Sequence, residues 1–572
     1  MMTSTYDVLL GRLQAAFDAI VPGADPVLRP SERSDYQANG VMALAKSRGK
    51  NPRDMALEVV SHLDLTGVAT VEVAGPGFLN LTLTPDFLND QLGTLLSDER
   101  LGVARGDARI AVIDYSAPNV AKEMHVGHLR STVIGDALAR MYRFRGDTVI
   151  ARNHVGDWGT PFGMLIEHLL DLGEDEAIAS LSIGDLDSFY RDARATFDAD
   201  DAFQERSRAR VVALQGGDAE TRRLWQILVN ESVAYFAEVY AALDVTLTPG
   251  DVVGESYYND MLEDVVRDLD AQGLLVESGG ALCVFPEGFT NRDGEPLPLI
   301  VQKRDEGFGY AATDLAAVRD RVSRLHADEI LYVVGAPQGQ HFDMVFAVAR
   351  AAGWLPDTVR CEHVAFGNVL GPDRKMFKTR SGETVKLIGL LEEATQRADA
   401  ALMHRSNDLS EDERHRLARQ IARAAVKYAD LSTDRQRDYV FDLDRMIAFE
   451  GDTGPYLQYA HARLRSIFRR LDTPWEPGAV HFALREDAAR SLALGLVAFP
   501  EALEAALATL QPHRLSGYLF DLAQRLTSFY EACPVLSAPE PTRSERLALC
   551  DLTSRTLALG LALLGIDAPD QM

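Results

Sequence analysis

The stretch SAPNVAKEMHVGHLRSTVIGDALARMYRFRG, residues 116–146, places two histidines and a lysine between a short apolar segment and a long amphipathic one. Before it, residues 108–115 (ARIAVIDY) form a mostly apolar run that is typical of a buried parallel strand. After it, apolar residues recur at helical spacing from Val126 to Phe144, and Gly146 ends the pattern. His125 and His128 therefore lie near a predicted helix N-terminus, where free backbone N–H groups and the helix dipole favour a phosphate.

Length and composition indicate a large globular chain. The 572 residues are enough for about three or four domains of about 150 residues each, and 47% hydrophobic residues can form sizeable cores. The N-terminus lacks a basic region followed by an apolar signal segment, and no run of about 18 uncharged apolar residues occurs. We therefore expect a cytoplasmic protein with no membrane segment. The four cysteines lack CxxC spacing, so neither a disulfide framework nor a zinc site is expected.

The charge balance argues in two directions. A formal net charge of −27 repels a polyanion at long range, and by itself it favours an enzyme acting on small molecules. Residues 456–470, however, carry four arginines, two tyrosines and no acidic residue, and residues 414–437 form a second basic run that includes Lys427. Such faces can bind phosphates and stack on unpaired bases, although a solvated helix face is the alternative for either run alone.

The pattern of elements predicts three domains. Residues 1–100 start with a helical run and end in alternating segments around Pro76-Gly77, which predict a hairpin in a small α+β domain. Residues 101–395 alternate apolar strands, such as 148–155 and 329–336, with helices, as in a doubly wound α/β domain. Acidic helical segments around 165–290 predict an insertion into that domain. Residues 396–572 are almost entirely of helical pattern and predict a helical bundle.

Two short motifs indicate the class. Residues 125–128 (HVGH) follow the pattern HxGH, and residues 375–379 (KMFKT) lie in a predicted loop about 250 residues later. Either motif alone is weak. The order of elements is more specific: a strand, HxGH at a helix start, an insertion, a second α/β half and then a basic loop. In this order the chain resembles the class I aminoacyl-tRNA synthetases, whose HIGH and KMSKS signatures lie at these two places. The resemblance implies a Rossmann-like catalytic domain.

Longer segments narrow the resemblance to the arginyl-tRNA synthetase family. Residues 116–136, residues 153–166 (NHVGDWGTPFGMLI), residues 302–317 (QKRDEGFGYAATDLAA) and residues 454–467 (GPYLQYAHARLRSI) are similar to that family's blocks, and the similarity covers essentially the whole chain. It implies that ATP with Mg²⁺ activates L-arginine, that arginine then passes to the 3′ end of tRNA(Arg), and that activation needs bound tRNA. It also implies a monomer, an N-terminal domain that recognises the tRNA D-loop, and a C-terminal domain that binds the anticodon.

The activation chemistry explains the residue types of the motifs. When a carboxylate attacks the α-phosphorus of ATP, no side chain forms a covalent bond, so positioning and neutralisation of phosphate charge must dominate. His125 and His128 can hold phosphates at the helix start, and Gly127 allows close approach. Lys122, Lys375 and Lys378 can supply mobile positive charge, which completes the predicted catalytic set. The predicted ATP-binding residues are Lys122, His125, Gly127, His128, Lys375, Met376, Phe377 and Lys378.

The amino-acid pocket must recognise a guanidinium, which is planar, always charged and suited to bidentate pairing with a carboxylate. Tyr310 and Asp314 are four residues apart, so they share a face if residues 310–321 are helical. The tyrosine could then pack on the guanidinium while the aspartate pairs with it. The resemblance implies arginine-binding roles for Asp114, Ser116, Asn119, His125, Tyr310, Asp314 and Gln338.

The tRNA contacts are likewise implied by the resemblance, at Phe78, Asn80, Tyr456, Tyr459, Arg463 and Arg469.

Two features depart from the family's patterns. Phe377 and Thr379 stand where KMSKS has serines, so the lysine roles transfer and the hydroxyl roles do not. Phe78 can stack on a base but offers no phenolic hydroxyl.

Two other classes of protein share part of this pattern. A nucleotidyltransferase also uses HxGH on a Rossmann-like fold, but such an enzyme needs neither the arginine-rich helical third nor the long insertion. A non-catalytic tRNA-binding relative would be expected to lose the histidines or lysines, and this chain keeps them. ATP–pyrophosphate exchange with each amino acid would test the nucleotidyltransferase alternative, and charging of total tRNA with each of the twenty amino acids is the most informative single experiment.

Overall fold

The computed structural model describes residues 4–31, 33–182, 186–304, 307–377, 385–403, 409–478 and 480–572. The chain divides into two compact units. Unit 1 comprises Met1–Arg105, Tyr456–Ala562 and Asp567–Met572, and unit 2 comprises Gly106–Pro455 and Leu563–Ile566. Each unit is therefore assembled from segments that are distant in the sequence.

The N-terminal part of unit 1 is a small antiparallel sheet with helices, in strand order β1-β2-β4-β3. The predicted hairpin is confirmed, since β3 (Ala69–Ala74) and β4 (Phe78–Leu83) pair antiparallel across the turn at Pro76-Gly77. Alternate β4 residues are buried, which is the period-two pattern of a half-buried strand. The remaining elements are α1 (Thr5–Asp18), β1 (Leu28–Pro30), β2 (Tyr36–Ala38), α2 (Val41–Arg48), α3 (Pro52–His62) and α4 (Pro85–Ser97).

Five helices form the C-terminal part of unit 1: α17 (Gly454–Arg469), α18 (Asp487–Val497), α19 (Phe499–Thr509), α20 (His513–Ala532) and α21 (Thr542–Leu563). They pack on the N-terminal part, where Arg490 of α18 donates to both carboxylate oxygens of Asp35 at 2.7 and 2.6 Å. Among the described residues no single helix is long and apolar enough to cross a membrane, although α18 and α19, bent by 41°, reach that length and composition as a pair.

Unit 2 is built on a parallel sheet in the order β11-β10-β5-β6. The three predicted strands are confirmed as β5 (Ile110–Asp114), β6 (Thr148–Arg152) and β10 (Glu329–Tyr332), with β11 (Arg360–His363) at one edge. The chain leaves β5 through α5 (Val126–Arg145) toward β6, and it leaves β10 through α13 (Gly339–Ala351) toward β11. The strand order therefore reverses between β5 and β10, and open α/β sheets bind ligands at the carboxyl ends of such a pair.

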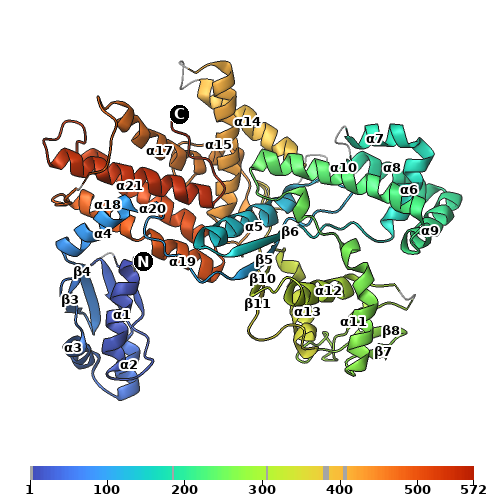
Figure 1. The fold of residues 1–572 in the computed structure, drawn as a ribbon, viewed down its shortest axis with the longest axis horizontal. Helices are drawn as coiled ribbons and strands as arrows, with labels where there is room; N and C mark the ends of the chain where they lie inside the picture. Colours follow the sequence, from blue (N-terminus) through green and yellow to red (C-terminus); the bar gives the residue numbers. More distant parts are fainter. Residues whose placement is uncertain are drawn as a thin grey trace. The chain divides into compact units, whose positions relative to one another are not determined.

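Helices cover both faces of this sheet, as the doubly wound pattern predicts. Val112 of β5 packs in one core with Leu315 of α12 (Tyr310–Ser323) and Val345 of α13. Figure 1 shows α5 on one side of the strands and α12 with α13 on the other. Because α12 leads into the parallel strand β10, its first turn lies near the carboxyl end of the sheet.

The remaining elements of unit 2 surround this sheet. The described residues of 165–290, predicted as a helical insertion, are mainly helical, but their last part contains β7 and β8 of a three-stranded antiparallel sheet, β7-β8-β9. These elements are α6 (Pro161–Leu172), α7 (Glu174–Ser182), α8 (Leu186–Ala199), α9 (Asp201–Gln215), α10 (Ala219–Leu243), η1 (Pro249–Asp251), η2 (Glu255–Tyr258), α11 (Asn259–Ala271), β7 (Val276–Ser278), β8 (Ala281–Val284) and β9 (Leu299–Gln302). After them come η3 (Ala336–Gln338), β12 (Val369–Leu370), α14 (Leu387–Met403), α15 (Glu411–Leu431), β13 (Tyr439–Val440) and α16 (Leu443–Met446). The predicted domain limit at residue 395 stays a prediction, whereas the compact units change at Tyr456.

Helix α15 is joined to α5 by buried charges. Arg130 Nε lies 3.2 Å from Asp430 Oδ2, with the two side chains 1% and 0% exposed. Lys427, fully buried, lies 3.8 Å from Asp136 Oδ2 and donates to the carbonyl of Leu243 at 2.9 Å. The interpretation of residues 414–437 as a phosphate-binding face is therefore wrong at Lys427, because that ammonium is an internal link between helices.

Arg130→Met should destabilise unit 2 by about 3–5 kcal/mol, because it leaves the Asp430 carboxylate buried without its partner. Urea denaturation followed by circular dichroism would measure the loss. The double variant Arg130→Met/Asp430→Leu should recover most of it, since no buried charge then remains. An equal loss in the single and double variants would show that packing, and not the ion pair, stabilises this contact.

Candidate active site

The loop between β5 and α5 contains three non-glycine residues in the left-handed backbone region, Ser116 (φ 74°), Ala117 (φ 48°) and Ala121 (φ 58°). Such conformations cost about 1–3 kcal/mol each and persist only where the surroundings fix them. Their backbone N–H groups donate, in that order, to Ser131 Oγ (2.8 Å), Asn153 Oδ1 (3.0 Å) and Ser232 Oγ (2.9 Å). Side chains from α5, from the segment after β6 and from α10 thus hold the loop in one shape.

The two motif histidines cap the N-terminus of α5. Nδ1 of His125 accepts from the Gly127 N–H at 3.0 Å, and Nδ1 of His128 accepts from the His125 N–H at 3.1 Å. Burial lowers the pKa of both rings, that of His128 to about 3. Because Nδ1 is the acceptor in each ring, the neutral imidazoles carry their proton on Nε2. At neutral pH the pair therefore offers two uncharged N–H donors.

The backbone N–H groups of this helix start are not free, contrary to the expectation from the sequence. The N–H of Val126 donates to the carbonyl of Val385 at 3.0 Å, that of Gly127 to His125, and that of His128 to the His125 carbonyl at 2.8 Å. A Cβ at Gly127 would lie 2.7 Å from Cε1 of the His125 ring. Glycine is therefore needed for the imidazole cap, and the imidazole Nε2–H groups remain as the donors for an anion.

The segment that follows the KMFKT loop pairs with the HxGH loop. His125 and Lys386 form an antiparallel bridge, with Val126 N–H donating to Val385 O at 3.0 Å and Leu387 N–H to Met124 O at 2.9 Å. The Lys386 ammonium also lies 2.9 Å from the Glu123 carboxylate, whose side chain is 2% exposed. These contacts hold the HxGH loop against the segment that follows the KMFKT loop.

The first residues of the KMFKT loop are anchored by an aromatic pair. The Phe377 N–H donates to Val369 O at 3.2 Å, and its ring stacks on Phe441 with centroids 5.1 Å apart. Lys375 and Met376 are exposed. Phenylalanine in place of a motif serine thus serves as an apolar anchor. The predicted Lys378, with Thr379, lies outside the described residues.

Lys122 is held by the inserted helices. Its ammonium lies 4.5 Å from the centroid of the Tyr190 ring on α8, a cation–π contact. The next residue, Glu123, donates its backbone N–H to Asp187 Oδ1, also on α8, at 3.0 Å. The insertion therefore supports the loop that carries the first motif.

The predicted arginine-binding residues of the first half differ in their surroundings. Asp114, at the end of β5, is buried against Arg321, with Nη2 and Oδ2 2.5 Å apart. Ser116 is buried and its hydroxyl lies 2.8 Å from the Tyr240 hydroxyl, which makes it a support of the loop. Asn119 is exposed, and a Cβ at Gly156 would lie 2.3 Å from its side-chain oxygen.

In the second half, α12 begins at Tyr310, so Tyr310 and Asp314 share one helix as predicted. The Asp314 carboxylate lies 2.6 Å from Nε2 of His341, at the start of α13. Tyr310 is 75% exposed, and Gln338, at the end of η3, is exposed as well. Both side chains are accessible to a ligand at the carboxyl edge of the sheet.

Sequence reasoning missed three groups beside these carboxylates. His341 follows Gln338 by three residues, and Arg321 follows Asp314 by seven, which is two turns along the same helix. Glu255 is the third: burial and the charges of Asp157 and Asp314 raise its pKa to about 8. Helical spacing could have indicated the first two, whereas Glu255 reaches the site from the end of the insertion.

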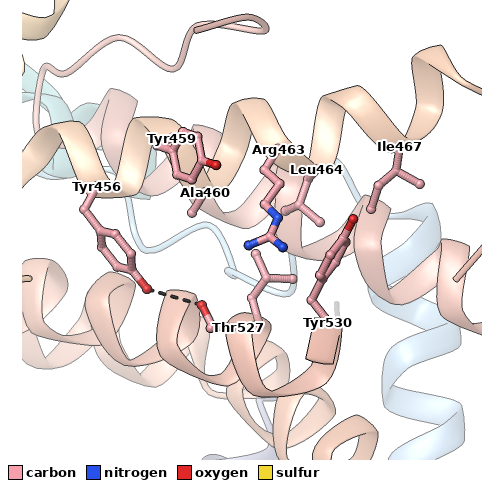
Figure 2. A pocket seen from close by; sticks show the side chains of 9 residues that line it. Tyr456, Tyr459, Ala460, Arg463, Leu464, Ile467, Thr527 and Tyr530 are labelled. Atoms are coloured by element: carbon pink, nitrogen blue, oxygen red, sulfur yellow. Dashed lines mark hydrogen bonds between the residues drawn. The ribbon is translucent and has the colours of Figure 1, made fainter. Parts of the chain in front are cut away.

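A groove in unit 1 brings together three of the four predicted C-terminal tRNA residues. Tyr456, Tyr459 and Arg463 of α17 line it with Thr527 and Tyr530 of α20, and Figure 2 shows Tyr456 hydrogen-bonded to Thr527 and Arg463 beside Tyr530. The Arg463 guanidinium lies 3.9 Å from the Tyr530 ring centroid, and Tyr459 is 42% exposed. Arg469, by contrast, donates to the Asp570 carbonyl at 2.7 Å.

The predicted N-terminal residues share a strand. Phe78 and Asn80 are two apart on β4, so their side chains lie on the same face of the sheet. Both residues are half-buried, and Oδ1 of Asn80 accepts from Gln37 Nε2 at 2.7 Å. Of the two side chains, only the Phe78 ring offers an aromatic face for stacking.

Comparison with known proteins identifies the family. The sequence profile described as tRNA synthetases class I (R), catalytic domain, matches residues 91–443. Profiles of the arginyl tRNA synthetase N terminal domain and the DALR anticodon binding domain match residues 9–83 and 457–572. The arginine–tRNA ligase of Thermobifida fusca is 54% identical over 579 residues, with 100% of both chains covered. The chain belongs to the arginyl-tRNA synthetase family.

Solved structures agree with this membership. The arginyl-tRNA synthetase of Plasmodium falciparum superposes with a TM-score of 0.87 at 28% identity over 100% of both chains. That of Thermus thermophilus gives 0.83 at 27% identity over 99% of both. The expected class I catalytic domain, N-terminal domain and helical anticodon domain are confirmed, and the activity of this family member is that of an arginine–tRNA ligase.

For this arginyl-tRNA synthetase family member, His128→Ala should lower the rate of arginine activation by about 100-fold or more, the usual effect of losing one preorganised donor. His128→Asn, which keeps an uncharged N–H donor, should retain most of the rate. Pyrophosphate exchange in the presence of tRNA would measure both, with thermal denaturation as a control for folding. A normal rate for the alanine variant would exclude the imidazole as a phosphate ligand.

Proposed function

We propose that this arginine–tRNA ligase binds ATP at the imidazole cap of α5 and arginine beside the first turn of α12. The carboxylate of arginine attacks the α-phosphorus, pyrophosphate leaves, and the arginyl group passes from AMP to the terminal ribose of tRNA(Arg). The observation that carries the proposal is the pairing of residues 124–126 with residues 385–387, which unites the two motifs at the carboxyl end of the sheet.

On the nucleotide side, the Nε2–H groups of His125 and His128 donate to phosphate oxygens. Lys122 and Lys375 supply positive charge as pyrophosphate forms, and the same role is proposed for Lys378. Mg²⁺ enters with ATP, because it prefers phosphate oxygens and water to an all-protein cage. In the described part of the chain, no cluster of three or more His, Cys, Asp or Glu side chains is placed to hold a metal ion.

On the amino-acid side, Asp314 pairs with the guanidinium and Glu255 adds negative potential. Tyr310 packs on the guanidinium plane, since the residue is 75% exposed and its ring is accessible to a ligand. Asn119 and Gln338 bind the α-amino and carboxylate groups. Such a pocket selects arginine over lysine, because a point charge cannot make the same bidentate contact.

On the tRNA side, the groove between α17 and α20 receives an unpaired anticodon base. The tyrosines offer stacking faces and Arg463 offers charge, which is the usual combination for single-stranded nucleic acid. Phe78 stacks on a base of the D-loop. We also propose that the protein acts as a cytoplasmic monomer and that bound tRNA is needed for activation, as the family resemblance implies.

The direct test is aminoacylation of total tRNA with each of the twenty amino acids. Arginine alone should be attached. Attachment of another amino acid would contradict the proposed pocket. ATP–pyrophosphate exchange without any amino acid would instead favour a nucleotidyltransferase.

Glu255 should make arginine binding depend on pH. Its carboxyl group, with a pKa of about 8, gains negative charge between pH 6.5 and 8.5, so the KM for arginine should fall as the pH rises through that range. Steady-state aminoacylation would measure the KM, with the KM for ATP as the internal control. Glu255→Gln should flatten the profile, and an unchanged profile in that variant would assign the pH dependence to another group.

Arg463 and Arg469, both on α17, provide a test variant and its matched control. Arg463→Ala should weaken tRNA binding and reduce the log–log salt slope by about one unit, because one phosphate contact is lost. Arg469→Ala should change the slope less, since that guanidinium is engaged by Asp570. Filter binding between 50 and 200 mM salt, roughly the range over which such contacts are resolved, would measure both. An equal slope for wild type and Arg463→Ala would place the tRNA elsewhere.

A further inference from the structure

One of the carboxylates proposed for arginine binding already has a cation. Asp114 Oδ2 lies 2.5 Å from Nη2 of Arg321, and the two side chains are 5% and 1% exposed. A guanidinium of the protein itself therefore occupies the position at Asp114 in which a substrate guanidinium would make its ion pair. The negative charge that attracts substrate must come mainly from the side of Asp314, to which Glu255 adds charge as it ionises around pH 8.

Arg321 also connects the two halves of the sheet. It lies on α12, two turns from Asp314, and it reaches the end of β5 in the first half. Between these two positions, the guanidinium carbon of Arg321 lies 4.7 Å from the centroid of the Tyr332 ring. Tyr332 is the β10 residue that is paired with Asp114 in the parallel register. One buried side chain thus spans α12, β10 and β5.

We propose that Arg321 is a positioning residue for arginine, which fixes the orientation of Asp114 and its spacing from Asp314. One carboxylate oxygen of Asp114 is already paired with Arg321. Asp114 therefore acts on the substrate as an oriented hydrogen-bond acceptor and not as the main counter-charge. This inference rests on the proposed arginine-binding roles of Asp114 and Asp314. It assigns to Arg321 a part in substrate selection that needs no contact with the substrate.

The alternative is a purely structural ion pair. A buried pair that only stabilises the fold should lower the amount of folded enzyme, and therefore the apparent kcat, while the KM values for arginine and ATP stay unchanged. A residue that acts through Asp114 should change the KM for arginine, and its effect should disappear once Asp114 is replaced, because coupled residues are non-additive.

The test is a double-mutant cycle on the full chain with saturating tRNA, using Arg321→Met, Asp114→Asn and the double variant. Arg324→Met is the matched control, since Arg324, the residue that follows α12, also pairs with an aspartate, Asp320, but its own side chain is 51% exposed. Arg321→Met should raise the KM for arginine at least tenfold and the KM for ATP less than twofold. Asp114→Asn should do the same, and adding Arg321→Met to it should cause no further rise. Arg321→Lys keeps the positive charge but lacks the planar guanidinium. Compared with Arg321→Met, it should restore the midpoint temperature of unfolding more fully than the KM for arginine.

Three results would overturn the proposal: a KM for arginine within twofold of wild type in Arg321→Met, equal rises for arginine and ATP, or additive effects in the double variant. The double variant keeps the test valid if a single variant unfolds, because it leaves no unpaired buried charge. Should the wild-type protein fail to charge tRNA with arginine, the proposed function would fail, and that result is distinct from these three.

Discussion

The bridge between His125 and Lys386 is the contact on which the active site depends. It joins segments about 260 residues apart in the sequence, and the salt bridge from Lys386 to the buried Glu123 carboxylate reinforces it. Without it, the N-terminus of α5 would have an unpaired N–H group at Val126, and the strained loop after β5 would lose one of its supports. This one pairing links the HxGH loop to the segment that follows the KMFKT loop.

Several side chains of the candidate site carry no net charge or are already neutralised by a partner. Burial lowers the pKa of both imidazoles, so in the proposed site they donate to phosphate as neutral groups and the cationic charge comes from Lys122 and Lys375. On the proposed amino-acid side, Arg321 balances Asp114, and Asp314 is left to pair with a cation. The proposal therefore gives the nucleotide and the amino acid different electrostatic surroundings. Local fields of this kind are compatible with polyanion binding by a chain of net charge −27.

Much of the fold was predictable because the signals are local. The strands at 108–115, 148–155 and 329–336, the helix from Val126 and the hairpin at Pro76-Gly77 all follow from hydrophobic periodicity and turn residues. The joining of the N-terminal domain to α18 through Asp35 and Arg490 was not predictable, because no pattern reports a contact between residues 455 apart.

The candidate site was predictable in its residue types and less so in its contacts. The motif positions identified the histidines and Asp314, but not that each motif imidazole accepts a backbone N–H through Nδ1. Nor did they indicate that Lys427 is internal, because a basic helix run looks the same whether its lysine faces water or a buried Asp136. Burial of charge is decided by the partner element, which the local sequence does not contain.

The most direct measurement of the central claim is ATP–pyrophosphate exchange by the wild-type protein with arginine or lysine, each with and without tRNA(Arg). The account predicts exchange with arginine only, and only when tRNA is present. Exchange with lysine would contradict the carboxylate pocket. Robust exchange with arginine in the absence of tRNA would contradict the dependence of activation on bound tRNA.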